Sequence, residues 1–151
     1  MIRAVLVAAL AAVPVLAPAA QQMRTDARPA GGTLRPRADR PAEAVDLTAR
    51  PLAPTGMDDC PGFVDPSAPD VVVEWPGGDL RMTARADFDA TLAVAGPDGT
   101  WSCNDDGEGL SPVVERSGAP RGRYAVWVGS LAEAPDDRAA TFIAGRPGPP
   151  T

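Results

Sequence analysis

Residues 87–106 read D-F-D-A-T-L-A-V-A-G-P-D-G-T-W-S-C-N-D-D. Within this stretch, residues 91–95 alternate sides like a half-buried strand, and residues 100–103 form a second short strand. The Gly-Pro-Asp-Gly sequence between them has the composition of a tight turn, because Pro97 fixes φ and Gly99 accepts a positive φ. The stretch therefore predicts an antiparallel hairpin, followed by a polar loop that is rich in side-chain oxygen.

Further strand candidates recur on both sides of the hairpin, with turn residues between them. They lie at residues 71–75, 80–85, 112–115, 123–128 and 139–144. The strongest candidate is residues 123–128, which place Tyr124, Val126 and Val128 on one face and Trp127 on the other. No segment sustains the 3.6-residue apolar period of a helix. The spacing predicts an all-β domain over residues 60–146, built as an antiparallel β-sandwich or a barrel.

The first 19 residues resemble a signal peptide. Arg3 supplies the positive charge, and residues 4–16 form an apolar run that is too short to span a bilayer. Ala17-Pro18-Ala19 fits the small-residue cleavage pattern, which predicts cleavage after Ala19. A membrane anchor and a buried helix are the alternatives. The signal peptide predicts a bacterial periplasmic or secreted protein with no stable membrane span once the signal has been cleaved.

Residues 20–59 are rich in Pro, Arg and Ala and contain few large apolar side chains. Because proline interrupts helices, this composition predicts a disordered or extended tether. Residues 42–49 within it allow one helical turn or a short strand. Residues 147–151 are expected to form a flexible Pro/Gly tail.

The composition excludes several classes of function. The chain has 151 residues and a net charge of −6, and its acidic side chains concentrate in residues 60–146, which argues against nucleic acid as a partner. It contains no histidine, which removes His-based catalytic triads and His-ligated metal sites. A carboxylate pair, Asp105 with Asp106 or Asp87 with Asp89, leaves carboxylate catalysis as an alternative.

The two cysteines are expected to pair. Export would place Cys60 and Cys103 in an oxidising compartment, and they are the only cysteines in the chain. The bond would tie the first residue of the predicted domain to the end of the central hairpin. Two free thiols are the alternative.

Two motifs, in order, resemble a known family. P-D-G-x-W-x-C-x-D-D covers residues 97–106, and G-x-Y-x-V-W-V-G covers residues 122–129. Over residues 60–144 the chain resembles bacterial pre-peptidase C-terminal (PPC-like) domains, in a small stand-alone exported form. The resemblance implies a jelly-roll-like antiparallel sandwich without catalytic activity. Such domains accompany secreted hydrolases and aid secretion, substrate binding or stability, and some bind calcium. No protease domain is present in this sequence.

Oxygen-bearing side chains near the hairpin are candidate ligands for calcium, which takes six to eight oxygens from carboxylates, amides and carbonyls. The candidate set is Asp87, Asp89, Asp98, Asn104, Asp105 and Asp106. The spacing is not that of an EF-hand. In the alternative interpretation these side chains solvate and cap turns.

Trp101 and Trp127 are candidates for an aromatic binding platform, although core packing is the commoner role of tryptophan on a strand. These features together predict a non-catalytic, exported binding or accessory module of the cell envelope. Its partner would be an envelope protein, a peptide or a glycan. The alternatives are a peptidase-associated hydrolase that uses carboxylates and a structural, self-associating envelope protein.

Overall fold

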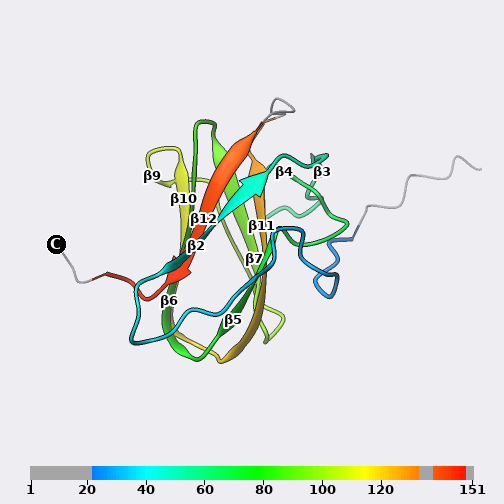
Figure 1. Cartoon of the computed structure of the whole chain (residues 1–151). Coiled ribbons are helices and arrows are strands. Elements are labelled where there is room, and N and C mark those ends of the chain that lie inside the picture. The colour runs from blue at the N-terminus through cyan, green and yellow to red at the C-terminus, as the bar shows by residue number, and fades with distance from the viewer. Residues whose placement is uncertain (1–21, 133–137, 149–151) are drawn as a thin grey trace, which may run out of the picture.

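The computed structural model describes residues 22–132 and 138–148, and within these ranges the chain forms strands and turns without a helix (Figure 1). The longer strands are β2 (Glu43–Thr48), β5 (Val71–Trp75), β6 (Gly78–Ala86), β7 (Ala90–Ala95), β8 (Trp101–Asn104), β10 (Ser111–Ala119), β11 (Gly122–Ser130) and β12 (Ala139–Gly145). The two-residue strands are β1 (Thr33–Leu34), β3 (Ala53–Pro54), β4 (Phe63–Val64) and β9 (Gly107–Glu108).

The eight longer strands pair antiparallel in two sheets. One sheet has the order β2-β12-β6-β10, and the other has the order β5-β11-β7-β8. If the eight strands are numbered along the chain, these orders become 1-8-3-6 and 2-7-4-5, which is the jelly-roll arrangement. The predicted all-β antiparallel sandwich of jelly-roll type is confirmed, as is the hairpin that β7 and β8 form.

The main core fills the space between the two sheets. Leu80 and Met82 of β6, Tyr124 and Val126 of β11, and Phe142 of β12 are all fully buried there. These side chains alternate with outward-facing residues along their strands, as the period-two pattern predicts. The Tyr124 hydroxyl donates a hydrogen bond of 2.7 Å to the Pro120 carbonyl, which satisfies the polar end of an otherwise apolar side chain.

A second layer of chain covers the outer face of the β5-β11-β7-β8 sheet. This outer layer consists of residues 22–27 and 53–66, and it includes β3 and β4, which lie beside β11 (Figure 1). It builds a smaller core of which Val64, Ala93 and Trp127 are members. All six residues of β7 are therefore buried, so the prediction of a half-buried strand over residues 91–95 is wrong.

Gly129 of β11 allows the outer layer to approach the sheet. A Cβ at this position would lie 2.1 Å from the Phe63 carbonyl oxygen and 2.7 Å from a Val64 methyl group. Both distances are shorter than any real Cβ contact, so a side chain at residue 129 would push β4 away from β11. The glycine that ends the second sequence motif is thus explained by close packing of backbone on backbone.

The prediction of a disordered tether over residues 20–59 is wrong for the part of it that the structure describes. Strand β2 pairs with β12 along its whole length, β1 pairs with β5, and β3 pairs with β4. Of the five prolines, Pro29 precedes β1, three lie in connections between these strands, and Pro54 ends the short strand β3, so proline does not interrupt β2. Residues 42–49 take the strand alternative. The domain therefore begins well before residue 60.

The predicted signal peptide over residues 1–19 lies outside the described residues, and so does the end of the predicted tail, residues 149–151. Residues 147–148 have no regular structure. Within the described ranges, no helix long and apolar enough to cross a membrane is found. The predicted disulfide between Cys60 and Cys103 is confirmed.

Candidate functional site

A partly buried arginine contacts two carboxylates beneath the outer layer. Arg50 follows β2, and its guanidinium lies 2.8 Å from an Asp65 oxygen and 3.0 Å from an Asp70 oxygen. The same guanidinium donates a hydrogen bond of 3.1 Å to the Ala68 carbonyl. The Arg50 side chain is only 15% exposed, so these contacts are weakly screened by water. The network ties the chain before the outer layer to the chain that leads into β5.

Asp70 is the most deeply buried member of this network. Burial raises the pKa of its carboxyl above the usual value, while a hydrogen bond from the Val128 amide and the nearby Arg50 guanidinium act in the opposite direction. One oxygen accepts the Val128 amide at 2.8 Å, and the other contacts Arg50. Both oxygens of Asp70 are therefore engaged within the chain, and this carboxyl fixes the position of β5 relative to β11.

The disulfide anchors the other part of the outer layer. Cys60 is 2% exposed and lies in the smaller core, and its partner Cys103 belongs to β8. The Thr55 hydroxyl donates a hydrogen bond to the Cys60 carbonyl, and the Thr55 amide donates one to the Gly62 carbonyl. Covalent and hydrogen bonds thus hold residues 55–62 against the sheet.

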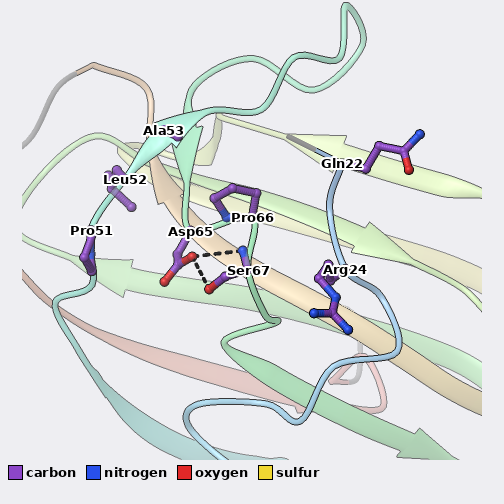
Figure 2. A pocket seen from close by; sticks show the side chains of 8 residues that line it. All are labelled: Gln22, Arg24, Pro51, Leu52, Ala53, Asp65, Pro66 and Ser67. Carbon is purple, nitrogen blue, oxygen red and sulfur yellow. Dashed lines mark hydrogen bonds between the residues drawn. The ribbon is translucent and has the colours of Figure 1, made fainter. Parts of the chain in front are cut away.

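A hollow of about 610 Å³, here named the outer groove, lies over this outer layer. Its apolar lining comes from Pro51, Leu52, Ala53 and Pro66, and its polar lining from Gln22, Arg24, Asp65 and Ser67. Figure 2 shows Gln22 and Arg24 on one side and Pro51 and Leu52 on the other, with Asp65, Pro66 and Ser67 between them. A hollow of roughly 300 to 1,000 Å³ with mixed lining is typical of a binding site for a small ligand.

The polar groups of the outer groove differ in how many of their hydrogen-bonding atoms are already engaged within the chain. Asp65 accepts hydrogen bonds from the Ser67 amide at 2.9 Å and from the Ser67 hydroxyl at 2.6 Å, and its other oxygen contacts Arg50. The Arg24 amide is bound to the Pro66 carbonyl, whereas the exposed Arg24 guanidinium has no partner among the described residues. The groove therefore presents a positively charged donor beside an apolar wall.

The two tryptophans of the predicted platform have different roles. Trp127 is fully buried, and its indole N–H donates a hydrogen bond of 3.0 Å to the Asp65 carbonyl, so it is a core residue and not a platform. Trp101 is half-buried, with its ring centroid 5.5 Å from that of Trp127 at an angle of 34°. Trp101 lines a second hollow of about 340 Å³ together with Met23 and Met57. Only one ring of the predicted pair is therefore accessible.

The predicted calcium ligands are not brought together. Asp98 lies in the turn between β7 and β8, where it accepts a hydrogen bond of 3.1 Å from the Thr100 amide and contacts Arg116. The hydrogen bond from Thr100 lowers the pKa of the Asp98 carboxyl, and Arg116 adds to this effect. Asn104 lies at the far end of β8, where its side-chain oxygen accepts the Val113 amide at 3.1 Å. Asp98 therefore stabilises a turn, and Asn104 bridges the two sheets.

The remaining four candidates, Asp87, Asp89, Asp105 and Asp106, lie at the Asn104 end of the hairpin. Among the described residues, no three or more Asp, Glu, Cys or His side chains are grouped so that they could hold a metal ion. The structure does bring other carboxylates together in pairs: Asp65 and Asp70 are bridged by Arg50, and the more exposed Glu108 and Glu115 are bridged by Arg81. Sequence reasoning missed the Arg50 network because Arg50 lies in the segment that was predicted to be a tether.

The motifs that carry the family resemblance have structural roles. The first contains the Asp98 turn and Cys103, and the second contains the buried Tyr124 and Trp127 together with Gly129. No family model matches the chain, and no curated protein sequence matches it either. The resemblance thus rests on these motifs and on what they imply about topology.

Proposed function

We propose that the protein is an exported, non-catalytic binding module of the PPC-like kind. Its outer groove would take a short apolar peptide segment that carries a carboxylate. The observation that supports this proposal is the Arg24 guanidinium, which has no partner among the described residues and lies across the groove from Pro51 and Leu52, with Pro66 between them. An arginine binds a carboxylate through two parallel hydrogen bonds, and the apolar wall would bury the neighbouring side chain of the peptide.

The chain beneath the outer groove is held rigidly, so the groove can bind a ligand without a large rearrangement of its own backbone. The Arg50 network lies beneath Asp65 on one side, and the disulfide holds residues 55–62 on the other. A preorganised site loses less conformational entropy on binding than a flexible one. The outer groove is therefore suited to modest but specific affinity for a small part of a larger partner.

Two further features support export and a non-catalytic role. Disulfides persist in oxidising compartments, which is consistent with a periplasmic or extracellular location and with the apolar run over residues 4–16. Carboxylate catalysis requires a pair of carboxylates free to act on a substrate. The oxygens of Asp65 and Asp70 are instead engaged by Arg50, Ser67 and Val128, which supports a structural role for this pair.

The proposal is tested by titrating N-acetyl-leucyl-leucine into the ¹⁵N-labelled mature chain and following its amide resonances. We expect saturable shifts around Leu52 and Ser67, and binding that is about tenfold weaker for Arg24→Ala, because a hydrogen bond to a charged group is lost. Arg40→Ala removes an exposed arginine outside the groove and should bind like the wild type. The dipeptide amide, which lacks the carboxylate, should bind as weakly to the wild type as the acid binds to Arg24→Ala.

The apolar wall is tested separately with Leu52→Ser, which should also weaken binding. Leu110→Ser is the matched control, because Leu110 is 56% exposed and does not line the groove. The proposal fails if the wild type shows no saturable shifts, or if the acid and the amide bind equally to it.

A further inference from the structure

A third hollow, at the other end of the same sheet from the outer groove, is lined by three arginines. It has a volume of about 410 Å³, and we name it the arginine pocket. Its charged lining is Arg35, Glu74, Arg121 and Arg123, and Pro36 and Pro76 are part of its wall. It lies where β5 ends and β11 begins, whereas the outer groove lies before the start of β5.

The positive charge of the pocket is only partly neutralised. Arg35 pairs with Glu74 at 3.0 Å, and both side chains are at least half exposed. The Arg123 guanidinium donates to the carbonyls of Thr25 and Ala27, which are neutral acceptors, so its charge stays uncompensated. Arg121 is exposed and has no side-chain partner in the part of the chain that the structure describes. Three positive charges thus face one negative charge, in a chain with a net charge of −6.

The backbone holds these arginines in place. Arg123 lies directly across from Glu74 in the β11-β5 pairing, and Gly122 lies across from Trp75. Gly122 has φ of +149°, and a Cβ there would lie 2.7 Å from Pro97. The turn that presents Arg121 is therefore packed against the β7-β8 turn. The two hydrogen bonds to the carbonyls of Thr25 and Ala27 fix the Arg123 side chain.

We propose that the arginine pocket binds a phosphate or sulfate monoester carried on a sugar-sized group. Arginine presents planar N–H donors that match the oxygens of such anions, and a concave site with an excess of one sign of charge concentrates ions of the opposite sign. Arg121 supplies the uncompensated donor, and Arg123 supplies a second positive charge fixed on the strand. The pocket is larger than one inorganic oxyanion, so the group that carries the anion fills the rest of it against Pro36 and Pro76.

The experiment is calorimetric titration of the mature chain with glucose 6-phosphate at low ionic strength, with glucose and inorganic phosphate in separate titrations. We expect glucose 6-phosphate to bind more tightly than inorganic phosphate, no binding of glucose, and affinity that falls as salt is added. Arg121→Ala should weaken binding about tenfold. Arg85→Ala removes an exposed arginine from β6 in the other sheet and is the matched control.

A second variant distinguishes a loss of binding from a loss of folding. Glu74→Gln removes the negative charge of the pocket, so binding should become several-fold tighter, which an unfolded or damaged protein would not show. Arg24→Ala, in the outer groove, should leave the affinity unchanged. The proposal is overturned if about 10 mM glucose 6-phosphate, enough to saturate a millimolar site, gives no signal. It is also overturned if Arg121→Ala binds as Arg85→Ala does, or if glucose 6-phosphate binds no better than inorganic phosphate.

Discussion

Removing the disulfide should cost the protein much of its stability. Cys60 and Cys103 are separated by 43 residues in sequence, and closing a loop of that length in the unfolded chain is worth about 4 kcal/mol at 25 °C. The structure describes a domain of about 120 residues, for which the entropy of unfolding converts this free energy into a melting temperature lower by about 15 °C. The measurement is thermal unfolding of the reduced protein, followed by circular dichroism and compared with the oxidised protein.

The damage should be uneven over the molecule. The bond joins the outer layer to β8, so in the reduced protein the amides of Thr55 and Cys60 should lose protection from hydrogen exchange first. Strands β6 and β12 form the centre of the other sheet and should keep theirs. Such a pattern would identify the outer layer as the least stable part of the fold once it is no longer tied to the sheet.

A control separates the contribution of the covalent bond to stability from that of the packing of the two sulfur atoms. The double variant Cys60→Ala, Cys103→Ala loses both the bond and the buried sulfur atoms, and should melt slightly below the reduced wild type. The reasoning would be refuted if reduction lowered the melting temperature by less than about 5 °C, or if β6 and β12 lost protection before the outer layer.

Two more predictions concern charged groups. Because burial raises the pKa of Asp70 above 3.8, its contribution to stability is full below that pH and is lost as pH rises through the pKa of the folded state. The unfolding free energy of the wild type minus that of Asp70→Asn, measured in urea, should therefore fall as the pH rises above about 4, and a rise would contradict the direction of the shift. Millimolar calcium should leave the melting temperature unchanged relative to chelator, since no three Asp, Glu, Cys or His side chains among the described residues are grouped so that they could hold a metal ion. A micromolar site would instead add about 4 kcal/mol.

The sandwich was predictable because its strands show local patterns. Residues 71–75 match β5 at both ends, and the Gly-Pro-Asp-Gly turn fixes the β7-β8 hairpin, in which Ala95 pairs with Trp101. The disulfide was predicted from the presence of two cysteines in a chain that was expected to be exported. The positions of the candidate calcium ligands relative to one another could not be predicted from local patterns. They depend on the direction in which each strand runs, and β8 carries Asn104 away from Asp98.

The Arg50 network could not be predicted from composition. Arg50 is one of several arginines in a Pro- and Ala-rich segment, and nothing local distinguishes it from its exposed neighbours. Its burial depends on β2 adding to the edge of a sheet through pairing with β12, a contact between residues more than ninety positions apart. Propensity within a short window carries no information about such pairing.

One signal in the sequence did indicate that the N-terminal segment is structured. Residues 91–95 are apolar or small at every position, and the outward positions of β11 include Ala125 and Trp127. A strand with one face in water alternates with polar residues, whereas a strand without them is buried on both sides. The outer face of this sheet therefore required a cover, and residues before β5 were available to supply it. That cover contributes most of the lining of the outer groove, and five of the eight lining residues lie in the segment that composition alone would assign to a disordered tether.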